Sequence, residues 1–207
     1  MRLLKDREMN SEIIDCIQGS DEWFAARLGI VTASHFKDVL NSKTGRGTYM
    51  MRLVAEKQQE KPQESFQSKA MENGTIYEEY ARTYYEDSGG VSVEQVGFIK
   101  MGQIGCSPDG LVGTDGGIEI KCSEGPTHYQ IILKDKMPTT HIPQVQGNMW
   151  VADRQWWDFI SYDPWGKHKP FYCKRIERDD GYIDNILKPA CEKFLQELND
   201  INERLGL

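Results

Sequence analysis

The hydrophobic pattern of the chain changes its period at Gly89-Gly90. Before this point, over residues 68–86, apolar residues recur at three- and four-residue spacing, which predicts a helix with one buried face. After it, the segments 91–99, 103–106 and 117–122 lean toward β-structure and are separated by Gly and Asp-Gly turns, which predicts strands. The chain therefore combines a long amphipathic helix with a sheet.

The other segments place helices on both sides of this sheet. The first third is predicted to be helical, with helix starts at Ser20-Asp21-Glu22-Trp23 and at Thr32-Ala33-Ser34, whereas Asn41 to Thr48 is predicted to be a loop. Helices are further predicted over 127–134, 142–151 and 179–205, and strands over 156–162 and 171–176. This order favours one domain over residues 1–207, of the α/β or α+β class, with a central mixed β-sheet flanked by helices.

Composition excludes several classes of protein. No apolar run approaches the roughly 18 residues of a membrane helix, and the charged segment 1–8 does not form a secretory signal. The 5 cysteines are scattered without Cys-x-x-Cys spacing, so reduced thiols and a cytoplasmic location are expected. A net charge of -7, from 25 Lys+Arg and 32 Asp+Glu, argues against a non-specific nucleic-acid coat protein. An enzyme that engages DNA in a confined channel can still be acidic overall.

The strongest local signal is Asp109, in a Pro-Asp-Gly turn, followed by Glu119-Ile120-Lys121. Alternate residues of a strand share a face, so Glu119 and Lys121 lie side by side. With Asp109 beside them, two carboxylates and the Ile120 backbone carbonyl offer hard ligands for Mg²⁺, and Lys121 is within reach of a metal-bound water. Such a metal serves phosphodiester hydrolysis by neutralising charge and activating water. An ordinary turn followed by an exposed Glu/Lys pair is the alternative.

The spacing of these residues resembles the Asp…Glu-x-Lys signature of restriction-endonuclease-like nucleases. A larger set of segments is similar to the phage lambda exonuclease family and covers the chain from about Gln18 to the C-terminal helix. This set consists of Gln18-Gly19-Ser20-Asp21-Glu22-Trp23, Arg27 to Ser34, Cys106 to Leu111, Gln144-Val145-Gln146 and Met149-Trp150-Val151. The resemblance implies a restriction-endonuclease-like core and a phage or prophage protein.

The same resemblance implies catalytic roles for individual residues. Asp109 and Glu119 match the metal-binding carboxylates of the family, and Lys121 matches the lysine that orients or deprotonates the attacking water. Glu78 falls where the family has an active-site glutamate near the second metal, and Gln144 falls where it has an active-site glutamine. Taken without the family, Glu78 and Gln144 are ordinary helix residues.

Further positions are candidates for DNA contact. Arg27 and Ser34 resemble the pair that receives a DNA phosphate, including the 5′-terminal one, a role suited to an arginine and a hydroxyl near a helix start. The alternative is that Arg27 pairs with an acidic neighbour and Ser34 caps its helix. Met71 corresponds to an apolar wedge that splays terminal base pairs, or else packs in the core. Arg46 and Lys43, in the Gly-flanked loop, are candidates for contact with the duplex backbone, or else the loop is merely solvated.

The function implied is an Mg²⁺-dependent 5′ to 3′ exonuclease that processively digests linear double-stranded DNA to mononucleotides and leaves a 3′ strand for phage recombination by annealing. Two Mg²⁺ ions are expected, for which Mn²⁺ can substitute. The expected partners are double-stranded DNA ends, two further copies in a ring-shaped homotrimer, and a single-strand annealing protein in the bacterial cytoplasm, with no membrane. An endonuclease or nickase on the same fold stays open as an alternative. So does a catalytically silent DNA-end-binding protein, although Asp109, Glu119 and Lys121 argue against it.

Overall fold

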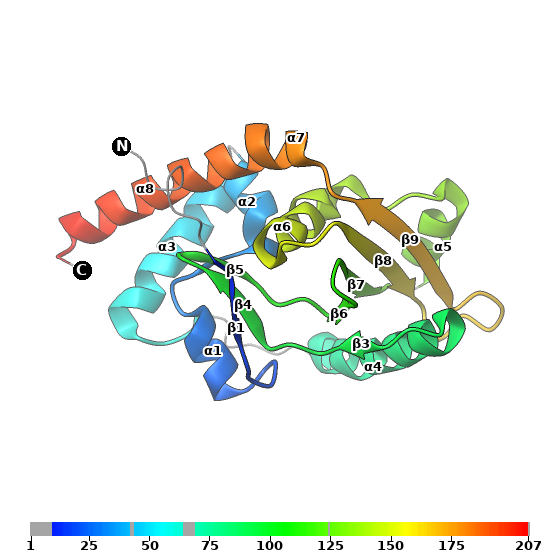
Figure 1. Ribbon diagram of the computed structural model, residues 1–207. Coiled ribbons are helices and arrows are strands. Elements are labelled where there is room, and N and C mark those ends of the chain that lie inside the picture. Colours follow the sequence, from blue (N-terminus) through cyan, green and yellow to red (C-terminus); the bar gives the residue numbers. More distant parts are fainter. Residues whose placement is uncertain (1–9, 42–43, 64–68, 124, 207) are drawn as a thin grey trace.

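The computed structural model describes residues 10–41, 44–63, 69–123 and 125–206 as two β-sheets with helices around them (Figure 1). The strands are β1 (Glu12–Ile14), β2 (Val31–Thr32), β3 (Val93–Glu94), β4 (Phe98–Met101), β5 (Ile104–Cys106), β6 (Gly110–Val112), β7 (Gly116–Cys122), β8 (Trp156–Tyr162) and β9 (Phe171–Glu177). The helices are α1 (Asp21–Arg27), η1 (Ala33–His35), α2 (Phe36–Leu40), α3 (Thr44–Gln59), α4 (Lys69–Gly89), α5 (Gly125–Lys134), η2 (Thr139–His141), α6 (Ile142–Ala152), α7 (Asp180–Tyr182), η3 (Ile183–Leu187) and α8 (Lys188–Arg204).

The larger sheet has the strand order β3-β6-β7-β8-β9. β7 and β8 are parallel along their whole length, and the other pairs are antiparallel. Glycine allows the close approach of β7 and β8, since a Cβ on Gly116 would lie 2.1 Å from the Trp156 ring and a Cβ on Gly117 would lie 2.4 Å from the Trp157 ring. β7 lies between β6 and β8 in the middle of the sheet, so most of its side chains are buried, polar ones included.

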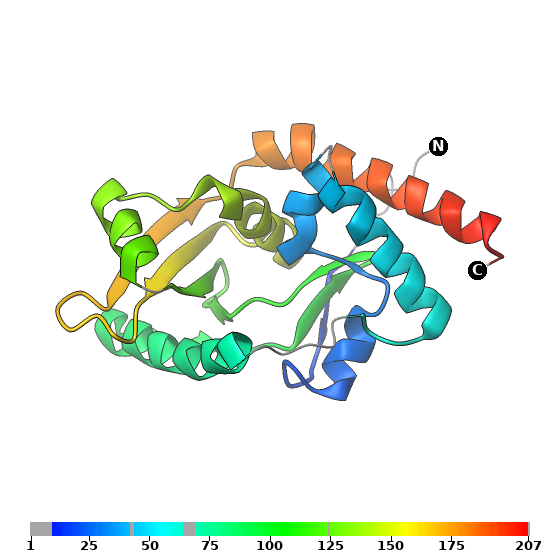
Figure 2. The same cartoon turned by 180° about the vertical axis from the view of Figure 1, so that it is seen from behind.

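Helices cover both faces of this sheet, with α4 on one side and α6 on the other (Figures 1 and 2). Ile118 and Ile120 of β7 pack with Ala81 and Tyr85 of α4 in one hydrophobic cluster. Glu119, between the two isoleucines, faces α6 instead. The alternation expected for this strand is confirmed. It places Glu119 against α6, which carries the polar side chains of Gln144 and Asn148.

The expected α/β class with a mixed sheet flanked by helices is confirmed, and the chain forms in addition a second, smaller sheet with the order β1-β4-β5-β2. β3 belongs to the larger sheet and β4 to the smaller one, so the strand predicted over 91–99 is divided between them. β1 and β2 contain three and two residues, too few to show a period. Residues 107–109 connect the two sheets, which places Asp109 at their junction.

The helices α2, α3 and α8 pack together away from the larger sheet (Figures 1 and 2). The rings of Tyr49 and Phe194 stack between α3 and α8, with centroids 5.6 Å apart. The helix predicted over 179–205 is present as α7, a π-helical turn over η3, and α8. Pro189 explains the irregular turn, because proline has no N–H and its ring displaces the carbonyl of the residue four positions earlier.

The loop predicted over Asn41–Thr48 is wrong from Thr44 onward, where α3 begins. Glycine lowers helix stability by about 1 kcal/mol, so Gly45 and Gly47 favoured a loop. The buried residues Tyr49 and Leu53 anchor the helix and outweigh that preference. By contrast, the helix predicted over 68–86 is confirmed as α4. Within the described chain, no helix has the length and apolar character that crossing a membrane requires.

Candidate active site

Asp109 and Glu119 lie opposite each other where the two sheets meet. Gly110 of β6 pairs with Ile118 of the antiparallel β7, and Asp109 and Glu119 flank this pair. The Asp109 carboxylate accepts a hydrogen bond from the backbone N–H of Ile120 at 2.6 Å. The structure thus brings the two acids together, whereas a role for the Ile120 carbonyl as a metal ligand stays a prediction.

Glu119 is 1% exposed, and donors surround its carboxylate. Oε1 accepts a hydrogen bond from Gln144 Nε2 at 2.6 Å and lies 2.6 Å from Lys121 Nζ. Oε2 accepts a hydrogen bond from Asn148 Nδ2 at 3.0 Å. Gln144 and Asn148 are four residues apart on α6 and therefore share one face of the helix. Sequence reasoning found Gln144 but missed Asn148, whose spacing from Gln144 was the available signal.

Lys121 is a cation in this arrangement. Burial lowers the pKa of its ammonium group, but the nearby carboxylates of Glu119 and Asp109 raise it, and the net effect is a pKa above the usual value. In this arrangement the lysine is a counter-ion and a hydrogen-bond donor to Glu119, and its role toward an attacking water stays a prediction.

Glu78 of α4 adds a third carboxylate to the site. Burial raises its pKa; Lys121 lowers it, and Glu119 raises it further. Burial also raises the pKa of Asp109 well above the usual value, and the charges of Glu119 and Glu78 act in the same direction. Arg82, one turn after Glu78, donates from Nε to the backbone carbonyl of Asp109 at 3.1 Å. Three acids therefore face two cations, Lys121 and Arg82, and the balance of charge favours a further cation.

The donor chemistry of the site fits Mg²⁺, because carboxylate and backbone carbonyl oxygens are the hard ligands that this ion prefers. Within the described residues, however, no three His, Cys, Asp or Glu side chains converge into a ready-made metal site. The Glu119 carboxylate already contacts the Lys121 ammonium and accepts hydrogen bonds from Gln144 and Asn148 of α6. A metal ion held by Glu119 would compete with these donors for the carboxylate oxygens.

Arg27 is tied to the segment that carries Asp109. Its Nη1 donates to Ser107 Oγ at 3.0 Å, and Trp23 Nε1 donates to the same hydroxyl at 2.9 Å. The Arg27 guanidinium also lies 4.0 Å from the centroid of the Trp23 ring. Sequence reasoning did not single out Ser107 as a site residue, although it stands two positions before Asp109. Arg27, Trp23 and Ser107 form one polar cluster beside the carboxylates.

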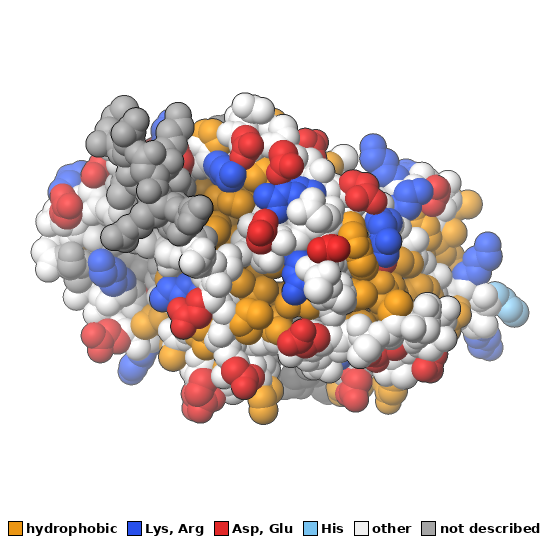
Figure 3. Space-filling view, viewed as in Figure 1, with side chains coloured by type: hydrophobic (Ala, Val, Ile, Leu, Met, Phe, Trp, Pro, Cys, Tyr) orange, Lys and Arg blue, Asp and Glu red, His pale blue; other side chains and the backbone are white. Residues whose placement is uncertain are grey.

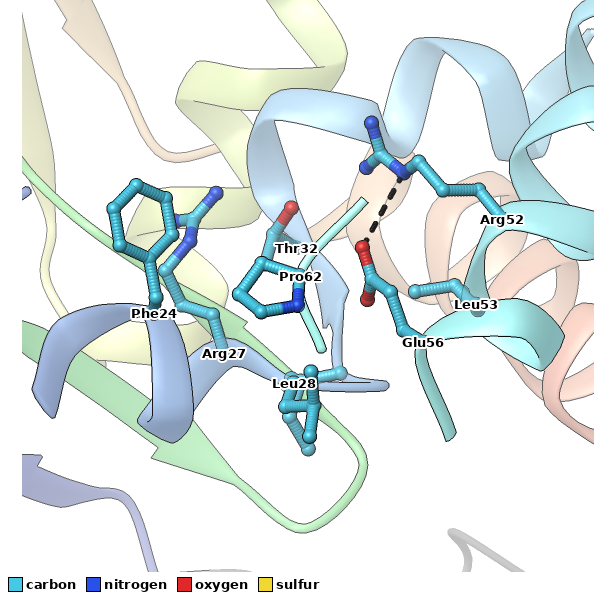
Figure 4. A pocket seen from close by; sticks show the side chains of 9 residues that line it. Phe24, Arg27, Leu28, Thr32, Arg52, Leu53, Glu56 and Pro62 are labelled. Atoms are coloured by element: carbon cyan, nitrogen blue, oxygen red, sulfur yellow. Dashed lines mark ion pairs between the residues drawn. The ribbon is translucent and has the colours of Figure 1, made fainter. Parts of the chain in front are cut away.

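Arg27 and Thr32 line a small hollow next to this cluster (Figure 4). Glu56, which is buried, forms an ion pair with Arg52 at 3.7 Å on the opposite side of the hollow. Ser34 Oγ lies 3.2 Å from Thr32 Oγ1. Ser34 is part of the 3₁₀ turn η1, which has no side-chain capping bond at its start, so the expected helix cap is not formed there.

The structure also places one further candidate for DNA contact, Arg46. Arg46 lies on α3, forms an ion pair with Glu197 of α8 at 2.6 Å and covers the Phe194 ring at 5.1 Å. Its role in DNA contact stays a prediction, and its observed role is to join two helices. The side chain of Met71 and residue Lys43 lie outside the described residues.

Two histidines occupy different environments near the sheet. His128 is fully buried and bridges Ser161 Oγ and the Lys169 carbonyl, each at 2.8 Å. His141 stacks on Phe159 with centroids 5.5 Å apart, and burial, reinforced by the charge of Lys121, lowers its pKa. Both residues thus have structural contacts, and His141 lies close enough to the site to sense its charge.

Comparison with known proteins supports a nuclease. The alkaline exonuclease LHK-Exo from Laribacter hongkongensis is 39% identical, with a TM-score of 0.85 over 90% of this chain and 96% of its own. Its complex with dAMP superposes with a TM-score of 0.84. A phage-related exonuclease from Haemophilus somnus 129PT shares the fold, at 15% identity and a TM-score of 0.63 over 83% of this chain and 96% of its own. No curated protein gave a significant sequence match.

The family assignment follows from a family model that covers the strands β2 to β7 and the site. The YqaJ-like viral recombinase domain matches residues 22–155, a range that contains Arg27, Asp109, Glu119, Lys121 and Gln144. As the resemblance to phage lambda exonuclease predicted, the chain belongs to the YqaJ-like viral recombinase family.

Proposed function

We propose that this protein is an Mg²⁺-dependent exonuclease that digests linear double-stranded DNA from 5′ ends, releases mononucleotides and leaves a 3′ single strand for recombination by annealing. One observation carries the proposal: Asp109, Glu119 and Lys121 meet at the end of a glycine-lined central strand, with Gln144 and Asn148 fixing the Glu119 carboxylate. This arrangement holds negative charge in a buried place, which costs stability and is explained by a cationic reaction partner.

Asp109, Glu119 and, on the other side, Glu78 are the residues that would hold two Mg²⁺ ions, with the Ile120 carbonyl as a further ligand. When bound, the ions supply charge neutralisation at the phosphate and a water of lowered pKa. The chain itself contributes the remaining steps. Gln144 and Asn148 orient Glu119, and the Lys121 ammonium, once released from Glu119, donates to an oxygen of the phosphate or of the attacking water.

The polar cluster of Arg27, Trp23 and Ser107 supports the choice of 5′ ends. A guanidinium and a hydroxyl suit a terminal phosphate dianion, and both are already placed beside Asp109. Ser34, whose hydroxyl contacts Thr32 on the lining of this hollow, is the second hydroxyl of this proposed phosphate site. The relative LHK-Exo was crystallised with dAMP, a mononucleotide, which supports mononucleotides as the product here.

A ring of three chains is proposed as the working assembly, in the bacterial cytoplasm, with a single-strand annealing protein as partner. The net charge of -7 supports a ring, since an enclosing assembly stays on DNA without an extended basic surface. Sedimentation at working concentration tests this assembly: a mass of one subunit, 23.8 kDa, would contradict it.

Digestion of linear duplexes that carry a 5′ phosphate on one chosen strand tests the activity. We expect Mg²⁺-dependent release of mononucleotides from the phosphorylated strand, partial rescue of activity by Mn²⁺, and no action on a closed circle. Lys121→Ala should be inactive, and Lys193→Ala, on the exposed side of α8, is the matched control that keeps activity. Cleavage of the circle would favour an endonuclease, and a lack of hydrolysis would favour a silent end-binding protein.

A further inference from the structure

Aromatic side chains gather on α4 and on the loop between β8 and β9. Trp165 is 69% exposed, Tyr80 is 57% exposed and Tyr84 is 45% exposed. The Tyr77 ring joins them, with its centroid 6.1 Å from Trp165 and 6.5 Å from Tyr80. We call Tyr77, Tyr80, Tyr84 and Trp165 the aromatic platform. A cluster of large exposed rings of this kind marks an interaction surface.

The loop presents Trp165 on a braced backbone. Asp163, which is 3% exposed, accepts hydrogen bonds from the backbone N–H groups of Trp165 at 3.0 Å and of Gly125 at 3.2 Å. The buried His128 donates from Nε2 to the Lys169 carbonyl at 2.8 Å, with the tautomer assigned from the carbonyl partner. The loop is thus fastened to α5 at both of its ends, and the exposure of Trp165 is a property of the fold.

The same loop carries positive charge in a protein of net charge -7. Lys167, His168 and Lys169 are consecutive and exposed. At the place of this loop in Figure 1, the space-filling view shows basic side chains around a histidine at the edge of the molecule (Figure 3). Rings that accept stacked bases, next to cations that face phosphates, are the chemistry of single-stranded nucleic-acid binding.

The platform begins beside the candidate active site. Tyr77 precedes Glu78 on α4, and Cys122, which follows Lys121, belongs with Tyr162 at the end of β8 to the hydrophobic cluster under α4. Tyr84 stacks on Phe171 of β9, with ring centroids 4.7 Å apart, and Phe171 pairs with Tyr162 of β8, so the platform reaches the ends of these strands.

We propose that the aromatic platform binds the unpaired DNA strand that digestion leaves, with bases stacked on Trp165 and the tyrosines and phosphates facing Lys167 and Lys169. This inference rests on the proposed exonuclease function. It assigns to the chain a second DNA site, selective for single strands, that is separate from the carboxylates.

Binding of a fluorescein-labelled oligothymidylate to the full-length protein in EDTA, followed by anisotropy, tests the inference. We expect Trp165→Ala to bind between about 5-fold and about 100-fold more weakly than the wild type, the range for loss of one stacked base. Trp165→Tyr should retain most of the affinity, because it keeps a ring. The variant with both Lys167→Ala and Lys169→Ala should also bind more weakly and show a shallower dependence of affinity on salt.

The matched control changes an exposed apolar residue and an exposed lysine far from the loop, Ile186→Ala with Lys193→Ala, and should bind like the wild type. Unchanged affinity of Trp165→Ala overturns the inference. So does a fall in the sedimentation mass of Trp165→Ala with unchanged affinity, which would assign the platform to contacts between copies. Digestion of a linear duplex by the same wild-type preparation separates the two ideas. If digestion occurs and Trp165→Ala still binds normally, only the inference fails, and if digestion does not occur, the proposed function fails.

Discussion

Asp109 illustrates the cost of a charged site at the scale of one residue. Burial and the charges of Glu119 and Glu78 destabilise the ionised form of its carboxylate. Lys121 and the backbone N–H of Ile120 stabilise that form. Protein stability is the small difference between large opposing contributions, so such a group measurably weakens the fold. The site is therefore a place where function and stability oppose each other.

Asp109→Asn should raise the melting temperature of the metal-free protein at neutral pH while abolishing hydrolysis. The folded pKa of Asp109 lies above the unfolded value of 3.8, so the charged form destabilises the fold increasingly as pH rises through that interval. Asparagine keeps an oxygen for the Ile120 N–H and removes the charge. Each kcal/mol relieved should raise the melting temperature by about 2–4 °C. Melting in EDTA at several pH values checks this, and no gain at neutral pH over acidic pH would refute it.

Asn148→Ala should raise the Mg²⁺ concentration that hydrolysis requires, without unfolding the protein. The amide holds Glu119 Oε2, and loss of a group that orients a metal ligand costs about 10- to 100-fold in affinity or activity. Mg²⁺ titration of hydrolysis measures the shift. Gln146→Ala is the control, because this buried amide of α6 bonds instead to the backbone of Glu177 and Asp179. Gln146→Ala should lower stability and leave the Mg²⁺ midpoint in place, and an equal shift in both variants would count against the assignment.

At the scale of elements, predictability followed length and periodicity. The helix α4 and the strands β7, β8 and β9 were predicted because each carries a repeating apolar pattern over seven residues or more. The start of α3 was not, because its stability comes from contacts with α8 rather than from local preference. Arg46 is the clearest case: a loop residue by its neighbours, it is helical through its pairing with Glu197.

Comparison of the single variants Arg46→Ala and Glu197→Gln separates the structural role of Arg46 from its predicted contact with DNA. The ion pair is partly exposed, so breaking it should cost about 1 kcal/mol, and loss of the arginine stem over Phe194 adds to the effect of Arg46→Ala. Denaturant unfolding measures these changes. If Arg46 also contacts duplex DNA, only Arg46→Ala should lower the affinity and the slope of its salt dependence. Equal DNA affinities for the two variants would confine Arg46 to the α3–α8 contact.

At the scale of the whole molecule, the sequence predicted which chemistry the chain carries better than how its parts meet. Strand alternation predicted that Glu119 and Lys121 share a face, and the family resemblance pointed to Asp109 beside them. Asn148 and Ser107 were missed because their roles depend on where α6 and α1 pack, although the four-residue spacing of Asn148 from Gln144 was a local signal. The division into two sheets escaped prediction for the same reason, since its strands are short and their partners are distant.

The ring proposal makes a prediction about topology. The inactive Asp109→Asn protein should load onto a linear duplex through its ends and dissociate slowly, because an enclosing ring leaves only by sliding off. Blocking both ends with bulky groups after loading should slow dissociation further, and blocking them before loading should prevent binding. Anisotropy or gel retardation measures both. Equal binding to open and blocked duplexes would show that the protein holds DNA on an open surface.

The Ser107 hydroxyl, which Arg27 and Trp23 both contact, stands two residues before Asp109 and next to a proline that stiffens the backbone. A terminal phosphate held by Arg27, as proposed above, is therefore kept at a fixed distance from the carboxylates. The protein sets this distance, and the DNA does not change it. In the exonuclease proposed here, this short segment acts as a gauge. It sets the length of the piece removed at each step and makes that length the same for every base.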